Sequence, residues 1–282
     1  MRRNDVSGTN RDVKPRTWLL FGALAALPAV WLAAGRLHRF AYWIGRMSPD
    51  ELQALATDGW QTVRLPVGND VELAGLVRPP TDAAARWLLF APGNSAGLLR
   101  GFRHVLDDLR GERDLGLALF AYRGFDASGG TPNPADLRAD LLRQWQWLRG
   151  RGVPADRIEI WGHSLGSVLA TQLAADVAAA GEPPHRLVLV AAGPHIAVMR
   201  FGLLGRFLPE DVYDVGDAPG RVGCPTVIVH GEQDTALAPA AARDLAARFG
   251  ERATLHLLDG RGHLDLWQDA RRIAFAAAPT SR

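Results

Sequence analysis

The chain has 282 residues, 48% of them apolar, which is enough to bury one large hydrophobic core. Its 32 basic residues, almost all arginine, are scattered among 30 acidic ones and leave a formal net charge of +2. No basic cluster is interleaved with aromatic side chains, so nucleic-acid binding is disfavoured. The single cysteine, Cys224, excludes an intramolecular disulfide and a thiolate metal site. We expect it to be a small buried apolar residue.

The N-terminal part has a different composition from the rest. Residues 1–16 form a basic tail, and residues 17–35 are uncharged and almost wholly apolar. At ~1.5 Å per residue, a helix over 17–35 just spans the hydrocarbon core of a bilayer. We therefore predict a transmembrane helix or signal anchor there, followed by a connector over residues 36–59.

The balance of charge around this span predicts its orientation. Basic residues before the span narrowly outnumber those after it, which places the N-terminus in the cytoplasm and the remaining chain on the extracytoplasmic side. Two alternatives stay open. The span could be a cleaved secretory signal, leaving a secreted or periplasmic domain, or a helix packed on the domain itself.

Over residues 60–282, short apolar runs alternate with helical patterns. Trp60 to Leu65 and Val71 to Val77 flank Gly68-Asn69-Asp70, a pattern typical of an antiparallel hairpin. Six later runs have the length and composition of buried strands: Trp87 to Ala91, Leu115 to Tyr122, Ile158 to Trp161, Leu187 to Ala192, Thr226 to His230 and Ala253 to Leu258.

Helical spacing of apolar residues separates several of these runs. It occurs over Pro134 to Leu148, Ser164 to Ala180 and Pro239 to Phe249. The alternation predicts an α/β domain with about eight strands, mostly parallel, and helices on both faces. Residues 194–224 contain an amphipathic pattern from Ile196 to Leu208. We expect them to form a small cap over the functional site, whose residues lie in loops at one edge of the sheet.

The strongest local motif is Gly162-His163-Ser164-Leu165-Gly166, between a strand pattern and a helical one. A serine nucleophile in such a context sits on a sharp turn, and glycines two residues before and after it permit the backbone angles. The alternative is an ordinary serine that caps a helix.

A serine hydroxyl needs a general base, and the base needs a third group to hold it in one tautomer. Asp234 follows the strand pattern that ends near His230, and His263 follows the last strand pattern. We predict Ser164 as nucleophile, His263 as base and Asp234 as the orienting acid, in the chain order nucleophile, acid, base.

Other acidic residues and histidines near these loops are alternatives for the acid and base roles. Glu232 lies on the same loop as Asp234 but closer to the strand, which makes it the less favoured acid. His256 and His230 fall within or at the end of strand patterns and are expected to be packed residues. His163 is expected to pack or hydrogen-bond locally, and Asp259 and Asp265 to be solvated or to brace their loop. No spacing of histidines and carboxylates resembles a metal site.

An oxyanion hole needs two backbone N–H donors. We expect one from Leu165, directly after the nucleophile, and the other from Asn94 in the loop that follows the third predicted strand. The alternative for this Gly/Asn/Ser-rich segment is a plain flexible loop.

With these motifs, residues Trp60 to Trp267 resemble the serine α/β-hydrolase superfamily. Gly93-Asn94 and Tyr122-Arg123-Gly124-Phe125 with Ser128 resemble a compact group with the motifs H-G-N-x and Y-R-G-[YF]-x-x-S. Pro92 departs from that group, which usually has histidine there. The backbone donor is unaffected by this change, but the bracing supplied by that side chain is lost.

The resemblance implies hydrolysis through an acyl-enzyme without any cofactor. We expect a carboxylic ester hydrolase with a small or lipid-like acyl substrate, attached to a membrane through the N-terminal helix. A thioesterase or peptidase with the same triad is the enzymatic alternative. A non-catalytic binding protein that kept the fold is the alternative from a different class.

Overall fold

The computed structural model describes residues 42, 44–111, 113–196 and 214–276. All of them belong to residues 39–282, the second of two units into which the chain divides. The predicted span over residues 17–35 lies outside the described residues, as does the helical pattern of the predicted cap beyond Ile196. Within the described ranges, no helix is both long enough and apolar enough to cross a bilayer.

Eight strands form one sheet in the order β1-β2-β4-β3-β5-β6-β7-β8. Strand β2 runs antiparallel to both of its neighbours, and the pairs from β4 through β8 are parallel. The strands span Gln61–Gly68 (β1), Val71–Arg78 (β2), Trp87–Ala91 (β3), Gly116–Phe120 (β4), Ile158–His163 (β5), Arg186–Val190 (β6), Thr226–Gly231 (β7) and Ala253–Leu258 (β8). The predicted mostly parallel sheet of eight strands is confirmed.

The predicted hairpin is also confirmed. Strands β1 and β2 are joined by Asn69 and Asp70, both with positive φ, of 51° and 54°. Two central residues of positive φ are the signature of a type I′ turn, whose twist matches that of the flanking strands.

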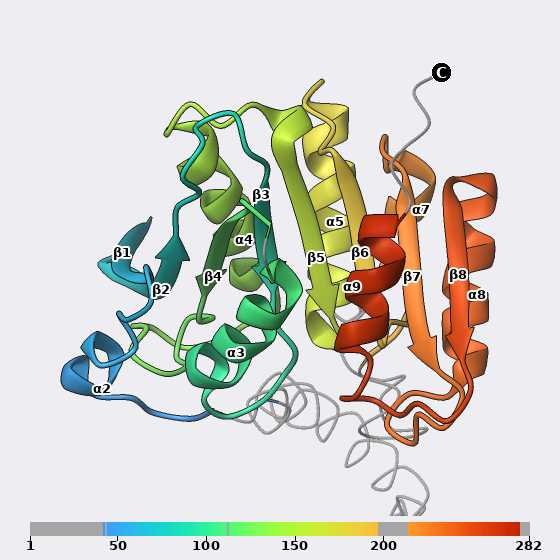
Figure 1. Cartoon of the computed structure of the whole chain (residues 1–282), viewed down its shortest axis with the longest axis horizontal. Helices are drawn as coiled ribbons and strands as arrows, with labels where there is room; N and C mark the ends of the chain where they lie inside the picture. The colour runs from blue at the N-terminus through green and yellow to red at the C-terminus, as the bar shows by residue number, and fades with distance from the viewer. Residues whose placement is uncertain (1–41, 43, 112, 197–213, 277–282) are drawn as a thin grey trace, which may run out of the picture. The chain divides into compact units, whose positions relative to one another are not determined.

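Helices cover both faces of the sheet (Figure 1). Their bounds are Pro49–Gln53 (α2), Leu98–Arg110 (α3), Pro134–Arg149 (α4), Leu165–Ala179 (α5), Ala218–Arg221 (α7), Pro239–Phe249 (α8) and Trp267–Ala276 (α9), with short 3₁₀ turns at Ala155–Arg157 and Gly250–Arg252. Helices α3 and α9 lie against each other on one face, and α4 and α5 pack together on the other. The arrowheads of β5, β7 and β8 point to the lower edge of the sheet in Figure 1, where the loops that carry the predicted site residues begin.

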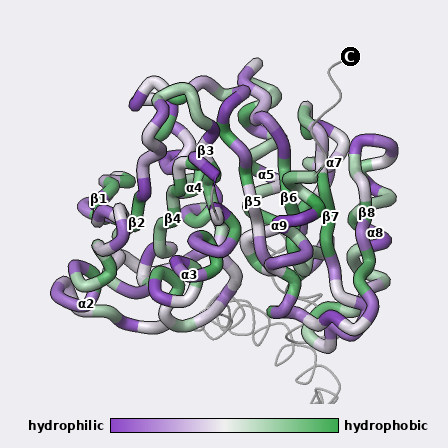
Figure 2. Tube along the Cα trace, in the orientation of Figure 1, coloured by the Kyte–Doolittle hydropathy of each residue, from purple (hydrophilic) through white to green (hydrophobic). Residues whose placement is uncertain are grey.

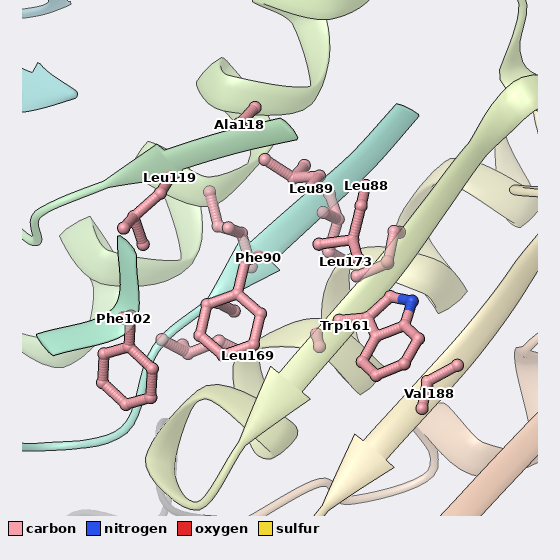
Figure 3. Packing of buried hydrophobic residues seen from close by; sticks show 14 of the residues in the cluster. Leu88, Leu89, Phe90, Phe102, Ala118, Leu119, Trp161, Leu169, Leu173 and Val188 are labelled. Carbon is pink, nitrogen blue, oxygen red and sulfur yellow. The ribbon is translucent and has the colours of Figure 1, made fainter. Parts of the chain in front are cut away.

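The core lies between these layers. The middle of strand β7 is coloured apolar in Figure 2, whereas much of helix α9 is polar. On β3, Phe90 is fully buried and its ring centroid lies 5.1 Å from that of Phe102 on α3 (Figure 3). Cys224 is 5% exposed, as expected, and burial raises the pKa of its thiol to about 12.

One close backbone contact joins helix α5 to the loop after β3. A Cβ atom built on Gly166 would lie 2.0 Å from the carbonyl oxygen of Ala91 and 2.6 Å from that of Pro92. A Cβ atom on Gly162 would lie 2.5 Å from the carbonyl oxygen of Gly166. Only glycine fits at these two positions, so the sequence motif reflects a steric requirement of this contact.

We predict that Gly166→Ala lowers the free energy of unfolding by several kcal/mol. Alanine favours a helix over glycine by about 1 kcal/mol, but the added methyl group would overlap a backbone carbonyl that cannot rotate away. Gly101→Ala is the matched control because Gly101 also lies within a helix, with nothing within 4 Å of its built Cβ. Urea denaturation should show the control unchanged or stabilised, and an equally stable Gly166→Ala variant would contradict the steric argument.

Candidate active site

Ser164 lies at the turn between β5 and α5, with φ of 50° and ψ of −117°. A non-glycine residue rarely adopts a positive φ, and such strain persists only where the surroundings fix it. The Ser164 N–H donates to the carbonyl of Val190 on β6 at 3.1 Å, and the Ser164 carbonyl accepts from both the N–H and the hydroxyl of Ser167. These contacts hold the sharp turn that the sequence motif predicts.

The predicted acid and base lie in contact. His263 Nδ1 is 2.7 Å from Asp234 Oδ2, in a pair that brings together loops 29 residues apart. The other carboxylate oxygen of Asp234 accepts the N–H groups of Ala236, at 2.9 Å, and Leu237, at 2.8 Å. A carboxylate held in this way fixes the histidine tautomer with its proton on Nδ1, which leaves Nε2 as an acceptor.

Competing effects act on the pKa of Asp234. Burial by itself raises this pKa, but the hydrogen bond with His263 and the N–H group of Leu237 lower it by more. The net result is a pKa below the usual value for aspartate, so the carboxylate is ionised at neutral pH. An ionised Asp234 can stabilise a positive charge on His263.

Glu232, the alternative acid, points elsewhere. Its nearest charged partner is Arg243, at 3.9 Å, and its side chain is exposed.

Asp259 and Asp265 brace the loop that carries His263, which is one of the two predicted alternatives for them. Asp259 Oδ1 accepts from Gln233 Nε2 and from the N–H of Gly260, both at 2.9 Å, and Asp265 Oδ1 accepts from the N–H of Gly262 at 2.7 Å.

The neighbouring histidines are packed residues, as predicted. His163 Nε2 lies 3.2 Å from the carbonyl oxygen of His263, and the two ring centroids are 5.1 Å apart. Burial lowers the pKa of His163 to about 3, so it is neutral and Nε2 carries the donated proton. His230 is fully buried and its Nε2 donates to the carbonyl of Leu237 at 2.9 Å, while His256 is half-buried on β8.

Ser164 and His263 open onto one cavity of about 480 Å³. Its wall also includes Gly93, Asn94, Ser95, Phe102, His163, Ile196, Thr235, Ala236 and Leu264. Leu264 is 67% exposed, an unusual position for a large apolar side chain. No hydrogen bond joins the side chains of Ser164 and His263, and catalytic contacts of this kind often tighten only when substrate binds.

Of the two predicted oxyanion donors, one lies in the wall of the same cavity and the other follows a residue of that wall. Leu165 is the first residue of α5 and follows the nucleophile directly, and Asn94 lies in the cavity wall. The close contact at Gly166 holds the N-terminus of α5 against the loop that carries Asn94. Among the described residues, no group of three or more histidine, cysteine or acidic side chains is arranged to hold a metal ion.

Several residues of this site were not predicted from the sequence. These are Phe102, Thr235, Ala236 and Leu264, which form part of the cavity wall. Leu264 and Thr235 could have been suspected because each follows a predicted catalytic residue directly. Phe102 comes from α3, a helix far from those motifs in the sequence.

The chain is similar to known hydrolases over part of its length. The family model described as serine hydrolase (FSH1) matches residues 158–264, which include all three predicted catalytic residues. The lysophosphatidylserine lipase ABHD12 of Danio rerio is 30% identical over 167 residues, covering 52% of this chain and 43% of that protein. An uncharacterized protein of Mycobacterium tuberculosis (strain ATCC 25618 / H37Rv) is 28% identical over 216 residues, covering 71% of this chain and 74% of that protein. The chain thus spans less than half the length of the lipase it matches.

Solved structures share the fold. An α/β-hydrolase from Vibrio vulnificus superposes with a TM-score of 0.64 at 16% identity, covering 83% of this chain and 94% of that one. The Pyrococcus furiosus esterase Pf2001 superposes with a TM-score of 0.64 at 16% identity, covering 83% of this chain and 96% of that one. The strand order, the strained serine turn and these matches together assign the chain to the serine α/β-hydrolase superfamily.

Proposed function

We propose that this protein is a serine hydrolase that cleaves carboxylic esters through an acyl-enzyme. The observation that carries the proposal is the 2.7 Å contact between Asp234 and His263, beside a cavity that Ser164 also lines. A buried carboxylate that orients a histidine next to a strained serine is the arrangement that activates a hydroxyl nucleophile.

The steps follow from these positions. Ser164 Oγ attacks the ester carbonyl carbon while His263 Nε2 takes its proton, and the negative charge that develops on the carbonyl oxygen is stabilised by the N–H groups of Leu165 and Asn94. His263 then passes the proton to the departing alcohol, leaving an acyl group on Ser164. Water activated by His263 releases the acid and restores the serine.

The substrate that we propose is an ester with an apolar acyl group. Phe102, Ile196, Ala236 and the exposed Leu264 give the cavity a largely apolar wall. The name of the Danio rerio relative, a lysophosphatidylserine lipase, points to the same class of substrate. Thioester or amide cleavage would use the same triad, and a graded panel of nitrophenyl esters, thioesters and anilides would separate these activities.

Ser164→Ala tests the nucleophile. The parent protein should react with a fluorophosphonate probe and the variant should not, because the probe forms a covalent bond with an activated serine. Thr171→Val is the control, since Thr171 lies further along α5, away from the serine turn, and its hydroxyl donates only to the Ser167 carbonyl. Equal labelling of the parent and Ser164→Ala, read by in-gel fluorescence, would end this assignment.

Asp234→Asn tests the acid. An amide at this position would donate to Nδ1, leaving the proton on Nε2, where it blocks acceptance from Ser164. We expect kcat to fall about 10⁴-fold with a small change in KM. Glu232→Gln, on the same loop, should stay within a factor of two. The assignment of the acid is wrong if the two variants are equally impaired in steady-state ester hydrolysis.

We further propose that residues 17–35 tether the hydrolase domain, residues 60–282, to a membrane, with that domain on the extracytoplasmic side. The support is the uncharged apolar length of this segment and the balance of basic residues around it. The full chain should stay in the membrane fraction after a carbonate wash. Release into the soluble fraction at full mass would refute a spanning helix, and release at a reduced mass would indicate a cleaved signal.

A further inference from the structure

The loop after β4 contacts both ends of the loop after β3, which carries Asn94. At the near end, the buried Tyr122 hydroxyl donates to the carbonyl of Pro92 at 2.7 Å. Burial raises the pKa of Tyr122 above its usual value, so the hydroxyl keeps the proton that it donates. This contact restrains Pro92, two positions before Asn94.

At the far end, Asp126 caps helix α3 from outside the helix. Its side chain is 2% exposed, and Oδ2 accepts the N–H of Leu99 at 2.7 Å. The N–H groups of Leu98 and Gly97 also stabilise the carboxylate, although burial raises the pKa of Asp126 by more than they lower it. Gly97, at the N-cap position, has no side chain to make this cap itself.

Asp126 is itself held firmly. Its N–H donates to the carbonyl of Gly45 at 2.8 Å, and its carbonyl accepts from the N–H of Met47 at 3.2 Å. Two residues further along, Ser128 Oγ donates to the carbonyl of Ala121 and accepts from the N–H of Ala74 on β2. The loop after β4 is therefore fixed to the sheet and to the connector, and can serve as a rigid support.

We propose that Tyr122 and Asp126 are positioning residues that hold the loop over residues 92–97 so that the Asn94 N–H faces the oxyanion. This inference rests on the proposed function. A backbone donor acts only when it is aimed at the place where charge develops, and losing one such donor costs about 10²- to 10³-fold in rate. Tyr122 supplies the contact at the start of the Asn94 loop, and Asp126 supplies the contact at its end.

The test compares Tyr122→Phe and Asp126→Ala with the parent in the full chain. Each variant should lower kcat by roughly 10- to 100-fold while KM changes less than about threefold, because oxyanion contacts form chiefly in the transition state. The inhibition constant for a trifluoromethyl ketone, which forms a tetrahedral adduct with serine, should rise by the same factor as kcat/KM falls. Asp126→Asn keeps an oxygen that can accept from Leu99 and should recover most of the activity.

Asp114→Ala is the matched control. Asp114 also accepts two backbone N–H groups, those of Thr81 and Asp82, but it precedes β4 at the opposite edge of the sheet. This variant should leave kcat and ketone inhibition unchanged. If Asp126→Ala does not fold, Tyr122→Phe, which removes a single hydroxyl, decides the question.

Three results would overturn the proposal. The first is that folded Tyr122→Phe and Asp126→Ala variants keep the kcat of the parent. The second is that kcat falls but the trifluoromethyl ketone binds as tightly as before. The third is that Asp126→Asn loses as much kcat as Asp126→Ala. Failure of the proposed function gives a different result, since the parent would then neither hydrolyse esters nor react with a fluorophosphonate.

Discussion

The close approach of helix α5 to the loop after β3 is the contact on which the site depends. Gly166 lies so near the carbonyls of Ala91 and Pro92 that no side chain fits between them. This contact places the first N–H groups of α5 beside the Asn94 loop. Ser164, directly before α5, keeps its positive φ through its bonds to Val190 on β6 and to Ser167. Strain of this kind is maintained only by surrounding structure, and here the surrounding structure is backbone from two parallel strands.

Neutral histidines and a buried carboxylate organise the polar side of the cavity. His230 and His163 are buried with lowered pKa values, and each donates to a carbonyl of a loop that carries the acid or the base. Their uncharged state matters because a second positive charge beside His263 would oppose its protonation. The only ionised group in contact with the His263 ring is Asp234, within the part of the chain that the structure describes.

A second support reaches the site from the other side. Tyr122 contacts the start of the Asn94 loop, and Asp126 links the end of that loop to the connector that precedes the sheet. Ser128, in the same loop after β4, is bonded to β2. Gly45 of the connector is packed so tightly that a Cβ atom there would lie 2.7 Å from the N atom of Gly97. The described part of the connector, residues 42 and 44–59, therefore belongs to the folded unit over residues 39–282, and at Gly45 it packs against the loop that carries Asn94.

Sequence patterns alone predicted the strands, the hairpin turn and the serine turn. They also singled out Ser164, Asp234 and His263 as candidates for the triad. These features are local, since an apolar run, a pair of turn residues or a glycine two positions from a serine acts through its neighbours. The sequence also carried the helical spacing of α3, at Leu98, Phe102, Leu106 and Leu109, although this helix was not among the predictions. Tertiary structure alone decided which carboxylate meets His263, which side chains form the cavity wall and what supports the Asn94 loop. Those contacts join segments tens of residues apart, and their geometry depends on strand order and on how closely the layers pack.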